Sequence, residues 1–600
     1  MSLDCRSNGW PMSWLPSKSI RCSRGALIFL LQSSCALVNV LPMKFLKIFS
    51  AAIFLSSFSL FAAETNSITR EVVADAEKII GLEFTDKERD LMLNGLDGRL
   101  KSFEAIRKQN IPYTTPPAVL FNPIPVGFKF DTKFKKPKWS SPDKIKVPKD
   151  LDELAFCSVG ELGHLIKTRK ITSEQLTKMY LARLKKYGPK LECVVTLTEE
   201  LALEQARRAD REISSGKYRG PLHGIPYGAK DLLSTKGIPT TWGSVPFKDQ
   251  VFQEDATVIK RLEKAGAVLV AKTTMGELAW GEVWFGGMTR NPWAPKNGSS
   301  GSSAGSAAGT AAGLFAFSIG SETHGSILSP TATCGVTGFR PTYGRVSRTG
   351  VMSLSWTMDK LGPICRTVED CALVFNVIYG PDEIDQSLHD APFNYRPKVD
   401  LRKLRIGYLK SDFDKKKNQT NDLATFAKLE SLGAKLIPIE LPKFPLGNIS
   451  FVLSTEGAAF FDELTRSNRD DLMVRQIANA WPNVFRSARF VPAVEYLQAQ
   501  RIRYLLIQEM AKLMNDIDVY VAPWDLGENV LLTNLTGHPS VGLPNGFSES
   551  GNPTAITFVG KLFGEAEMLA VAKAFQDATD FHTKHPDLSK VLALDPIKQN

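Results

Sequence analysis

Two runs rich in glycine and serine, residues 300–305 and 322–326, lie within apolar sequence and follow a lysine, Lys230. Glycine permits backbone angles that a side chain forbids, and it lets main-chain N–H groups approach a ligand closely. A Gly/Ser run by itself is also typical of a flexible linker. Here, however, apolar residues 307–317 and 327–336 follow the two runs, and linkers are not flanked in this way. The pattern favours buried loops that present serine hydroxyls beside backbone donors.

Three motifs in a fixed order resemble the amidase signature family of serine hydrolases. They are residues 221–231, residues 291–305 and residues 320–326, and the likeness extends from about residue 155 to about residue 577. The amino-acid sequences of the second and third motifs are similar to those of bacterial peptide amidases. The resemblance implies an α/β amidase signature fold, in which a central twisted mixed β-sheet is covered by α-helices on both faces.

The same resemblance implies a role for each motif. Ser326 would be the nucleophile, Ser302 a serine that bridges protons, and Lys230 the base. It also implies a cis peptide bond between Gly301 and Ser302. The residues that would support these three are Asp231, Ser303 and Glu322.

The chemistry of amide hydrolysis is consistent with these roles. An amide carbonyl is a poor electrophile, so the reaction needs an activated nucleophile, a stabilised oxyanion and a protonated leaving amine. Lysine is a base only when neutral, and the apolar residues 225–229 indicate a desolvated setting that lowers its pKa. Successive N–H groups in a tight turn bind anions. The expected oxyanion donors are the backbone N–H groups of Thr323, His324, Gly325 and Ser326.

Four positions depart from the family pattern. Ser300 and Ala304 stand where glycine is usual, His324 where glycine is common, and Leu328 where arginine is frequent. The changes affect the pocket more than the three catalytic positions. His324 also suggests a rival Ser-His-Asp scheme, although it lies too close in sequence to Ser326 for the usual spacing.

Three aromatic residues precede the second motif. Trp280, Trp284 and Phe285 fit either a substrate pocket or the core, and the core is the favoured interpretation.

Composition agrees with a large globular enzyme. The 600 residues are 43% hydrophobic and 23% charged. Residues 1–63 carry about +5 of the net charge of +11, and no basic stripe with interleaved aromatics follows, so nucleic-acid binding is not predicted. The histidines and cysteines lack metal-ligand spacing, so neither a metal nor a cofactor is predicted. The five cysteines after Glu64 are expected to be small buried hydrophobic residues.

The N-terminal residues have the layout of a secretory signal peptide. After Met43 come two lysines, an apolar run over 48–61 and two small residues before Glu64. We therefore expect a signal peptide over 43–63, a periplasmic or secreted mature protein, and no stable membrane span after cleavage. Residues 1–42 would be an upstream extension or a misassigned start. The rival interpretation is that residues 1–63 anchor the protein in a membrane.

The remainder divides into an N-terminal appendage over 64–150 and an amidase catalytic domain over 151–597. The appendage is expected to be helical at first and then proline- and lysine-rich over 112–148. Helices are predicted to begin at the capping pairs Thr85/Glu88 and Thr172/Gln175, and residues 415–510 are predicted to be mainly helical. Buried strands are expected at 268–271, 404–408 and 519–522.

The predicted function is hydrolysis by water of a carboxamide or peptide-like amide through an acyl-enzyme. The substrate would be a small molecule or a peptide amide, and a homodimer is possible. Two alternatives stay open: the glutaminase (A) subunit of a tRNA-dependent amidotransferase, and a non-catalytic binding protein on an amidase scaffold.

Overall fold

The computed structural model describes residues 68–109, 111–141, 145–415 and 420–594. The chain divides into two compact units, Met1–Ile68 and Thr69–Asn600, and the described residues belong almost wholly to the second. The expected extension over 1–42 and the signal peptide over 43–63 lie outside the described residues.

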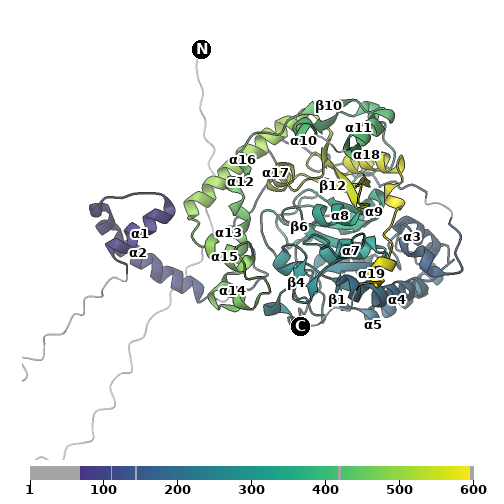
Figure 1. The fold of residues 1–600 in the computed structure, drawn as a ribbon, viewed down its shortest axis with the longest axis horizontal. Helices are drawn as coiled ribbons and strands as arrows, with labels where there is room; N and C mark the ends of the chain where they lie inside the picture. Colours follow the sequence, from purple (N-terminus) through teal and green to yellow (C-terminus); the bar gives the residue numbers. More distant parts are fainter. Residues whose placement is uncertain (1–67, 110, 142–144, 416–419, 595–600) are drawn as a thin grey trace, which may run out of the picture. The chain divides into compact units, whose positions relative to one another are not determined.

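The core of the second unit is a sheet that has eleven strands in the described part of the chain (Figure 1). In sheet order the strands are β1 (Val194–Leu197), β3 (Val268–Thr273), β2 (Pro226–Lys230), β6 (Phe317–Glu322), β8 (Lys360–Cys365), β7 (Thr337–Arg340), β12 (Ser540–Phe547), β13 (Pro553–Gly560), β11 (Val519–Pro523), β9 (Ile406–Leu409) and β10 (Leu436–Ile439). β2 pairs in parallel with β3 and β6, and β9 pairs in parallel with β10 and β11. The other neighbours are antiparallel, so the sheet is mixed, as predicted.

The described part of the chain also contains nineteen α-helices. They are α1 (Arg70–Ile80), α2 (Asp86–Arg107), α3 (Val159–Lys167), α4 (Ser173–Leu191), α5 (Glu199–Ser214), α6 (Thr257–Lys264), α7 (Ala304–Ala311), α8 (Leu328–Cys334), α9 (Val368–Ile378), α10 (Lys410–Lys415), α11 (Thr420–Ser431), α12 (Leu446–Ile449), α13 (Phe451–Phe460), α14 (Asp462–Arg466), α15 (Trp481–Ala488), α16 (Ala493–Asp516), α17 (Glu528–Thr536), α18 (Glu565–Asp577) and α19 (Ser589–Leu592). A small separate sheet pairs β4 (Val283–Trp284) with β5 (Gly287–Met288).

The sheet has a hydrophobic core on each face. Side chains of successive strand residues point to opposite faces. On β3, Val268 and Val270 pack in one core with the alanines of α7, whereas Leu269 packs in the other with residues of α9 and α18. Helices therefore cover both faces, which confirms the predicted fold class.

Local sequence signals explain several element boundaries. The reciprocal hydrogen bonds of both predicted capping boxes form, at Thr85 before α2 and at Thr172 before α4. β3 and β11 lie where buried strands were predicted, but β9 begins at Ile406 rather than at 404, because Leu401–Lys403 forms a 3₁₀ turn. β10 interrupts the helical stretch predicted over 415–510. Its four residues are apolar, but the run is short and contains Pro438, which is tolerated in a strand mainly at a sheet edge, where β10 lies.

Two parts of the predicted appendage make different contacts. α1 and α2 form a hairpin held by the ion pair of Glu77 with Arg89, at 2.7 Å. Further along, the N–H of Lys138 donates to the Tyr395 carbonyl at 3.0 Å, and that of Ser140 donates to the Glu369 carboxylate at 2.7 Å. The proline- and lysine-rich stretch therefore lies against the body that the sheet and its helices form.

Helix α7 consists only of small residues, all of them buried. It contacts β2, β3, β6 and β8, and its first turn follows directly on Ser303. A side chain at Gly305 would place a Cβ atom 2.2 Å from the Cys193 carbonyl oxygen and 2.5 Å from the Thr274 nitrogen. This close approach of backbones sets the position of the residues just before the helix.

We expect Gly305→Ala to lower the free energy of unfolding by about 2 kcal/mol, because backbone atoms have to move to admit the methyl group. Urea denaturation measures this. The matched control is Gly160→Ala in α3, where the nearest atom is a flexible hydroxyl 3.9 Å away and the change is expected to stay within about 1 kcal/mol. Equal effects of the two substitutions would contradict the prediction.

Candidate active site

Lys230 is the last residue of β2, between β3 and β6 in the sheet, and it is fully buried. Its Nζ atom donates to the hydroxyls of Ser302 at 2.8 Å, Ser321 at 2.9 Å and Ser303 at 3.1 Å. No carboxylate forms an ion pair with this amine in the described residues. The sequence-predicted base and bridging serine therefore lie in hydrogen-bond contact.

The burial of Lys230 changes its acid–base chemistry. Removal from water disfavours the charged amine and lowers its pKa from 10.5 to about 7, although the negative charges of Asp359 and Glu322 act in the opposite direction. At neutral pH a large fraction of this lysine is uncharged. Its lone pair can then accept a proton from a neighbouring hydroxyl.

The loop before α7 brings two serines to the lysine. The Gly301–Ser302 peptide bond is cis, as the resemblance implied. Ser302 and Ser303 are both fully buried, and the Ser303 hydroxyl bonds to the main chain of Ser321 at 3.1 Å. Ser300, which stands where the family pattern has glycine, has φ +59°, and its hydroxyl bonds to that of Ser329 at 2.7 Å. A left-handed backbone conformation explains why glycine is usual there.

Residues 323–327 connect β6 to α8 and are called the nucleophile loop after the role that the sequence predicts for Ser326. The Ser326 carbonyl accepts a hydrogen bond of 3.1 Å from the Ser303 N–H, which joins the two loops. Within the described residues, the Ser326 hydroxyl forms no hydrogen bond, and neither do the N–H groups of residues 323–326. Gly325 has φ +81°, so the turn is tight. Four successive free donors beside a serine hydroxyl have the character of an anion-binding nest.

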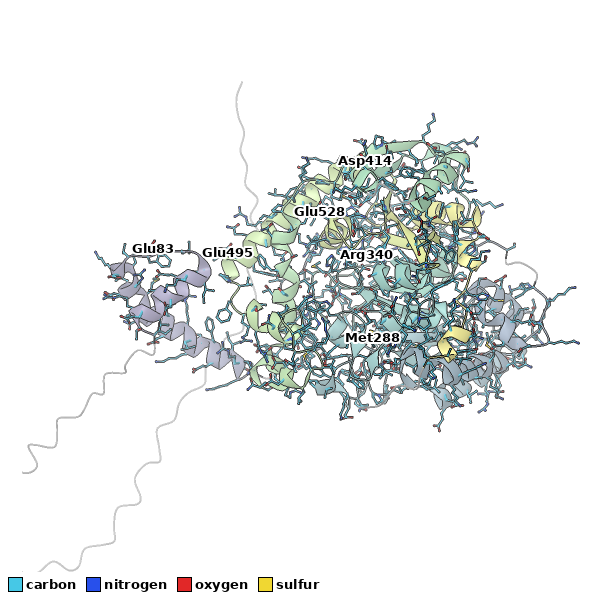
Figure 2. All side chains as sticks on the ribbon, viewed as in Figure 1. Glu83, Met288, Arg340, Asp414, Glu495 and Glu528 are labelled. Carbon is cyan, nitrogen blue, oxygen red and sulfur yellow. The ribbon has the colours of Figure 1, made fainter. Side chains whose placement is uncertain are left out.

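The Glu322 carboxylate holds this loop in place through four hydrogen bonds. It accepts from the N–H groups of Ile327 at 2.9 Å and Leu328 at 3.0 Å, and from the side chains of Arg340 at 2.6 Å and Asn534 at 2.9 Å. Arg340, labelled in Figure 2, is fully buried. Burial raises the pKa of the Glu322 carboxyl, but Arg340 and the hydrogen bonds outweigh it and bring the pKa to about 2. The predicted supporting role of Glu322 has a clear geometric basis.

Asp231 supports the site indirectly. Its carboxylate accepts from the Thr241 N–H at 2.8 Å and lies 3.0 Å from the Lys272 Nζ, with both charged groups fully buried. Lys272 is on β3, beside Ala229 of β2. Asp231 therefore neutralises the neighbouring lysine and leaves Lys230 without an anionic partner.

Besides Arg340, sequence reasoning did not single out two further residues of the site. The Ser321 hydroxyl accepts from Lys230, and the Asp359 carboxylate accepts from the Thr323 hydroxyl at 2.6 Å. Ser321 falls inside the third motif, so a signal for it was present. Asp359 directly precedes β8, and nothing in its local sequence connects it to residue 323.

The other sequence candidates have less direct placements. No hydrogen bond joins His324 to Ser326 in the described residues, so the Ser-His-Asp scheme has no geometric support here; burial also lowers the pKa of that imidazole. Trp284 is buried, whereas Trp280 and Phe285 are half-buried. The Trp280 ring lies edge-on to that of Trp481 at 4.7 Å.

Known protein families and relatives are similar to most of this chain. The family model described as Amidase matches residues 175–528. The A subunit of the glutamyl-tRNA(Gln) amidotransferase of Methylococcus capsulatus is 34% identical over 479 residues, which cover 72% of this chain and 98% of that protein. The chain belongs to the amidase signature family. It is therefore an enzyme of the class that acts on amide C–N bonds.

Two solved structures of amidases are similar to this chain. The peptide amidase from Stenotrophomonas maltophilia has 28% identity and a TM-score of 0.63, and the match covers 71% of this chain and 97% of that one. An amidase family protein from Bacillus anthracis has 30% identity and a TM-score of 0.65, covering 73% and 93%. The amidase signature fold thus extends over most of the chain.

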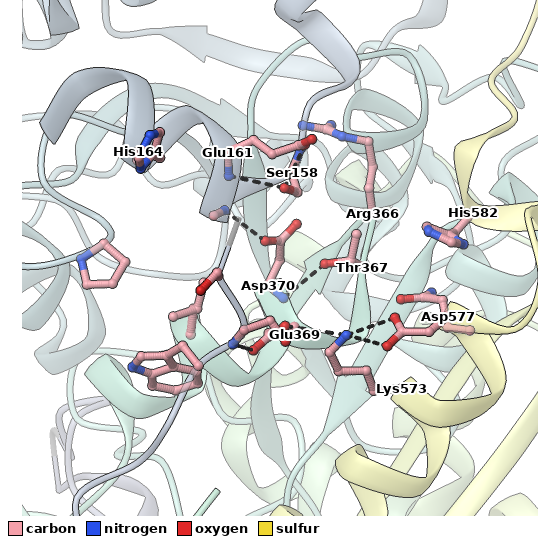
Figure 3. A pocket seen from close by; sticks show the side chains of 18 of the residues that line it. Ser158, Glu161, His164, Arg366, Thr367, Glu369, Asp370, Lys573, Asp577 and His582 are labelled. Atoms are coloured by element: carbon pink, nitrogen blue, oxygen red, sulfur yellow. Dashed lines mark hydrogen bonds and ion pairs between the residues drawn. The ribbon is translucent and has the colours of Figure 1, made fainter. Parts of the chain in front are cut away.

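A separate polar cavity of about 860 Å³ lies between α3, α9 and α18 (Figure 3). It has no lining residue among the serines and lysines of the candidate amidase site. Among its charged side chains, Lys573 pairs with Asp577 at 2.6 Å and Glu369 at 3.5 Å, and Asp370 accepts from the Gly160 N–H at 3.2 Å. The contacts of Glu369 and Asp370 connect α9 to α18 and to α3.

The described residues hold no group of three or more histidine, cysteine, aspartate or glutamate side chains arranged to bind a metal ion. In the same part of the chain, no helix combines the length and the apolar character that a membrane crossing requires. Four of the five described cysteines are buried, as predicted, and Cys157 is half-buried.

We expect Glu322→Gln to lower the free energy of unfolding by about 3 kcal/mol or more, because Arg340 then keeps a buried charge without an anion. Since the pKa of Glu322 is lowered in the folded state, its contribution is complete above about pH 4.5 and disappears as the pH falls toward 2. Urea denaturation between pH 3 and pH 7 measures both effects.

The control is Glu463→Gln, at an exposed ion pair with Arg469, where a change below about 1 kcal/mol is expected. A stability difference between Glu322→Gln and the native chain that stays constant down to pH 3 would contradict the assignment.

Proposed function

We propose that this chain is an amidase that hydrolyses a linear carboxamide or a peptide-like amide, with Ser326 as nucleophile, Ser302 as bridging serine and Lys230 as base. The observation that carries the proposal is the 2.8 Å contact between a lysine of lowered pKa and the Ser302 hydroxyl, in a loop bonded to the main chain of Ser326.

In the proposed acylation step, the Ser326 oxygen forms a bond to the amide carbonyl carbon. The Ser326 proton passes to Ser302, and the Ser302 proton passes to the neutral Lys230. The N–H groups of residues 323–326 bind the oxyanion, and removing one such donor typically costs about 3 kcal/mol. The C–N bond then breaks, and the amine leaves with the proton from Lys230 by the same relay.

Water completes the cycle. It attacks the acyl-enzyme while the relay accepts its proton, and the carboxylic acid is released as Ser326 recovers its proton. The overall reaction converts one amide and one water into one acid and one amine, and it needs neither a metal nor a cofactor.

A second candidate is the glutaminase component of a tRNA-dependent amidotransferase. It is supported by the 34% identity to a component of such an enzyme across 98% of that protein's length. The two functions differ in substrate, because the glutaminase would release ammonia from glutamine. Purified chain that releases ammonia from glutamine but from no simple amide would favour the second candidate.

We expect a fluorophosphonate to add covalently to the native chain at Ser326. Because only the neutral lysine is a base, the labelling rate should rise about tenfold per pH unit below pH 7 and level off above it. Intact mass spectrometry over pH 5–9 measures the rate.

Ser326→Ala should abolish labelling, and Lys230→Met should slow it at least a hundredfold. The matched control is Lys236→Met, at an exposed lysine nearby, which should label at the native rate. Absence of labelling in the native chain would favour a binding protein on an amidase scaffold.

We also propose that residues 43–63 direct export to the periplasm or the outside of the cell. The support is the basic, apolar and small-residue order that follows Met43. Sequencing the N-terminus of the mature protein tests this. We expect a start near Glu64, and a start before Met43 would refute the proposal.

A further inference from the structure

A predominantly apolar cavity of about 540 Å³ lies outside the set of residues proposed to carry the reaction. This volume is typical of sites for small organic ligands. Aromatic rings from distant parts of the chain form much of its wall. They include Tyr113, Trp242, Phe252, Trp356 and Phe460.

The cavity adjoins the catalytic residues through a shared wall. A much smaller cavity of about 10 Å³ is lined by Ser321, whose hydroxyl accepts from Lys230, and by Thr323 of the nucleophile loop. The two cavities share residues 351–353 and two further side chains, Leu232 and Arg348. These five shared residues connect the wall of the larger cavity to Ser321 and Thr323 of the candidate site.

One wall of the larger cavity comes from the N-terminal appendage, at residues 113–121. The Tyr113 ring lies 5.1 Å from that of Phe460 and 5.4 Å from that of Trp242, and the Phe121 ring lies 5.1 Å from that of Tyr343. Prolines at 112, 116 and 117 restrict the backbone of this stretch. Aromatic anchors thus fix both ends of a stiff segment.

Between these anchors, apolar side chains border space that none of the described residues fills. Leu120 and Val119 line the cavity and remain 49% and 70% exposed. Exposed aliphatic side chains that border a hollow are characteristic of ligand sites. Their burial by a ligand would contribute favourable free energy in proportion to the area covered.

Arg348, the positively charged side chain of the lining, is already paired with Asp385 at 3.2 Å. Glu254 lies 3.3 Å from Lys260, and Asp255 accepts from the Lys236 N–H at 2.7 Å. A carboxylate in the cavity would therefore find no unpaired positive charge among the described lining residues and would lose its hydration. The lining therefore suits an uncharged group and disfavours a zwitterion such as free glutamine.

We propose that this cavity binds a bulky uncharged apolar group of the amide substrate, and that residues 113–121 form the wall that selects it. The inference rests on the proposed amidase function, because it names the class of substrate for that site. It assigns a substrate-selecting role to the appendage that precedes the catalytic domain.

The first arm of the test measures hydrolysis by the full chain. The substrates are acetamide, butanamide, hexanamide and 4-phenylbutanamide, with release of ammonia as the readout. We expect kcat/KM to rise about fourfold for each methylene added to the acyl chain. Leu120→Lys should lower kcat/KM tenfold or more for the two longest amides, mainly through KM, and should change that of acetamide less than twofold.

The matched control is Val126→Lys, which places the same charge in the same stretch but outside the cavity lining, at a residue that is 79% exposed. It should reproduce the native profile. A flat dependence on chain length in the native chain, or equal profiles for Leu120→Lys and Val126→Lys, would overturn the proposal.

The second arm needs no turnover. Isothermal titration of 4-phenylbutanamide into the Ser326→Ala chain should show binding that Leu120→Lys weakens tenfold or more and Val126→Lys leaves unchanged. Absence of binding would overturn the cavity assignment even if fluorophosphonate labels native Ser326. Binding without labelling would instead overturn the proposed hydrolysis and keep the cavity assignment.

Discussion

The carboxylate of Glu322 is the contact on which the geometry of the site most depends. One side chain at the end of β6 fixes the start of α8, the end of β7 and one residue of α17, because it accepts from two backbone N–H groups, Arg340 and Asn534. Since those N–H groups belong to Ile327 and Leu328, the preceding turn keeps its own donors free. Ser326 is therefore presented by an anchored loop rather than by a mobile one, which is what preorganised stabilisation of an oxyanion requires.

Close packing complements this anchor. The Gly/Ser loop can meet the nucleophile loop only because α7, which follows it, is built of small residues against four strands. At Gly305 the packing leaves no room for a methyl group. The apolar surroundings that allow this packing also exclude water from Lys230, so the same feature of the sequence accounts for the fold of the loop and for the lowered pKa of the amine.

Sequence reasoning found the parts of the site that are local in the chain. Capping pairs such as Thr85 with Glu88 were predicted correctly because they depend on residues only three positions apart. The motif sequences identified Lys230 and Ser302, which form a hydrogen bond in the structure. Arg340 and Asp359 were not found, because their partners lie at distant positions in the sequence and each reaches the site through strand order. The edge strand β10 was missed because its apolar run is short and contains Pro438, and its place at the sheet edge follows only from the strand order. The cavity wall at 113–121 also depends on tertiary contacts that no local pattern encodes.

The pairing of Asp231 with Lys272 has a further consequence. Lys230 and Lys272 lie on adjacent parallel strands, and the Asp231 carboxylate pairs with Lys272, so that pair has no net charge. Glu322 and Arg340 form a second neutral pair. In the proposed step, a positive lysine and a negative oxyanion therefore appear together in the buried interior beside these two neutral pairs. The reaction is a separation of charge inside the protein, and dissolved salt, which screens exposed charges, should have little effect on its rate.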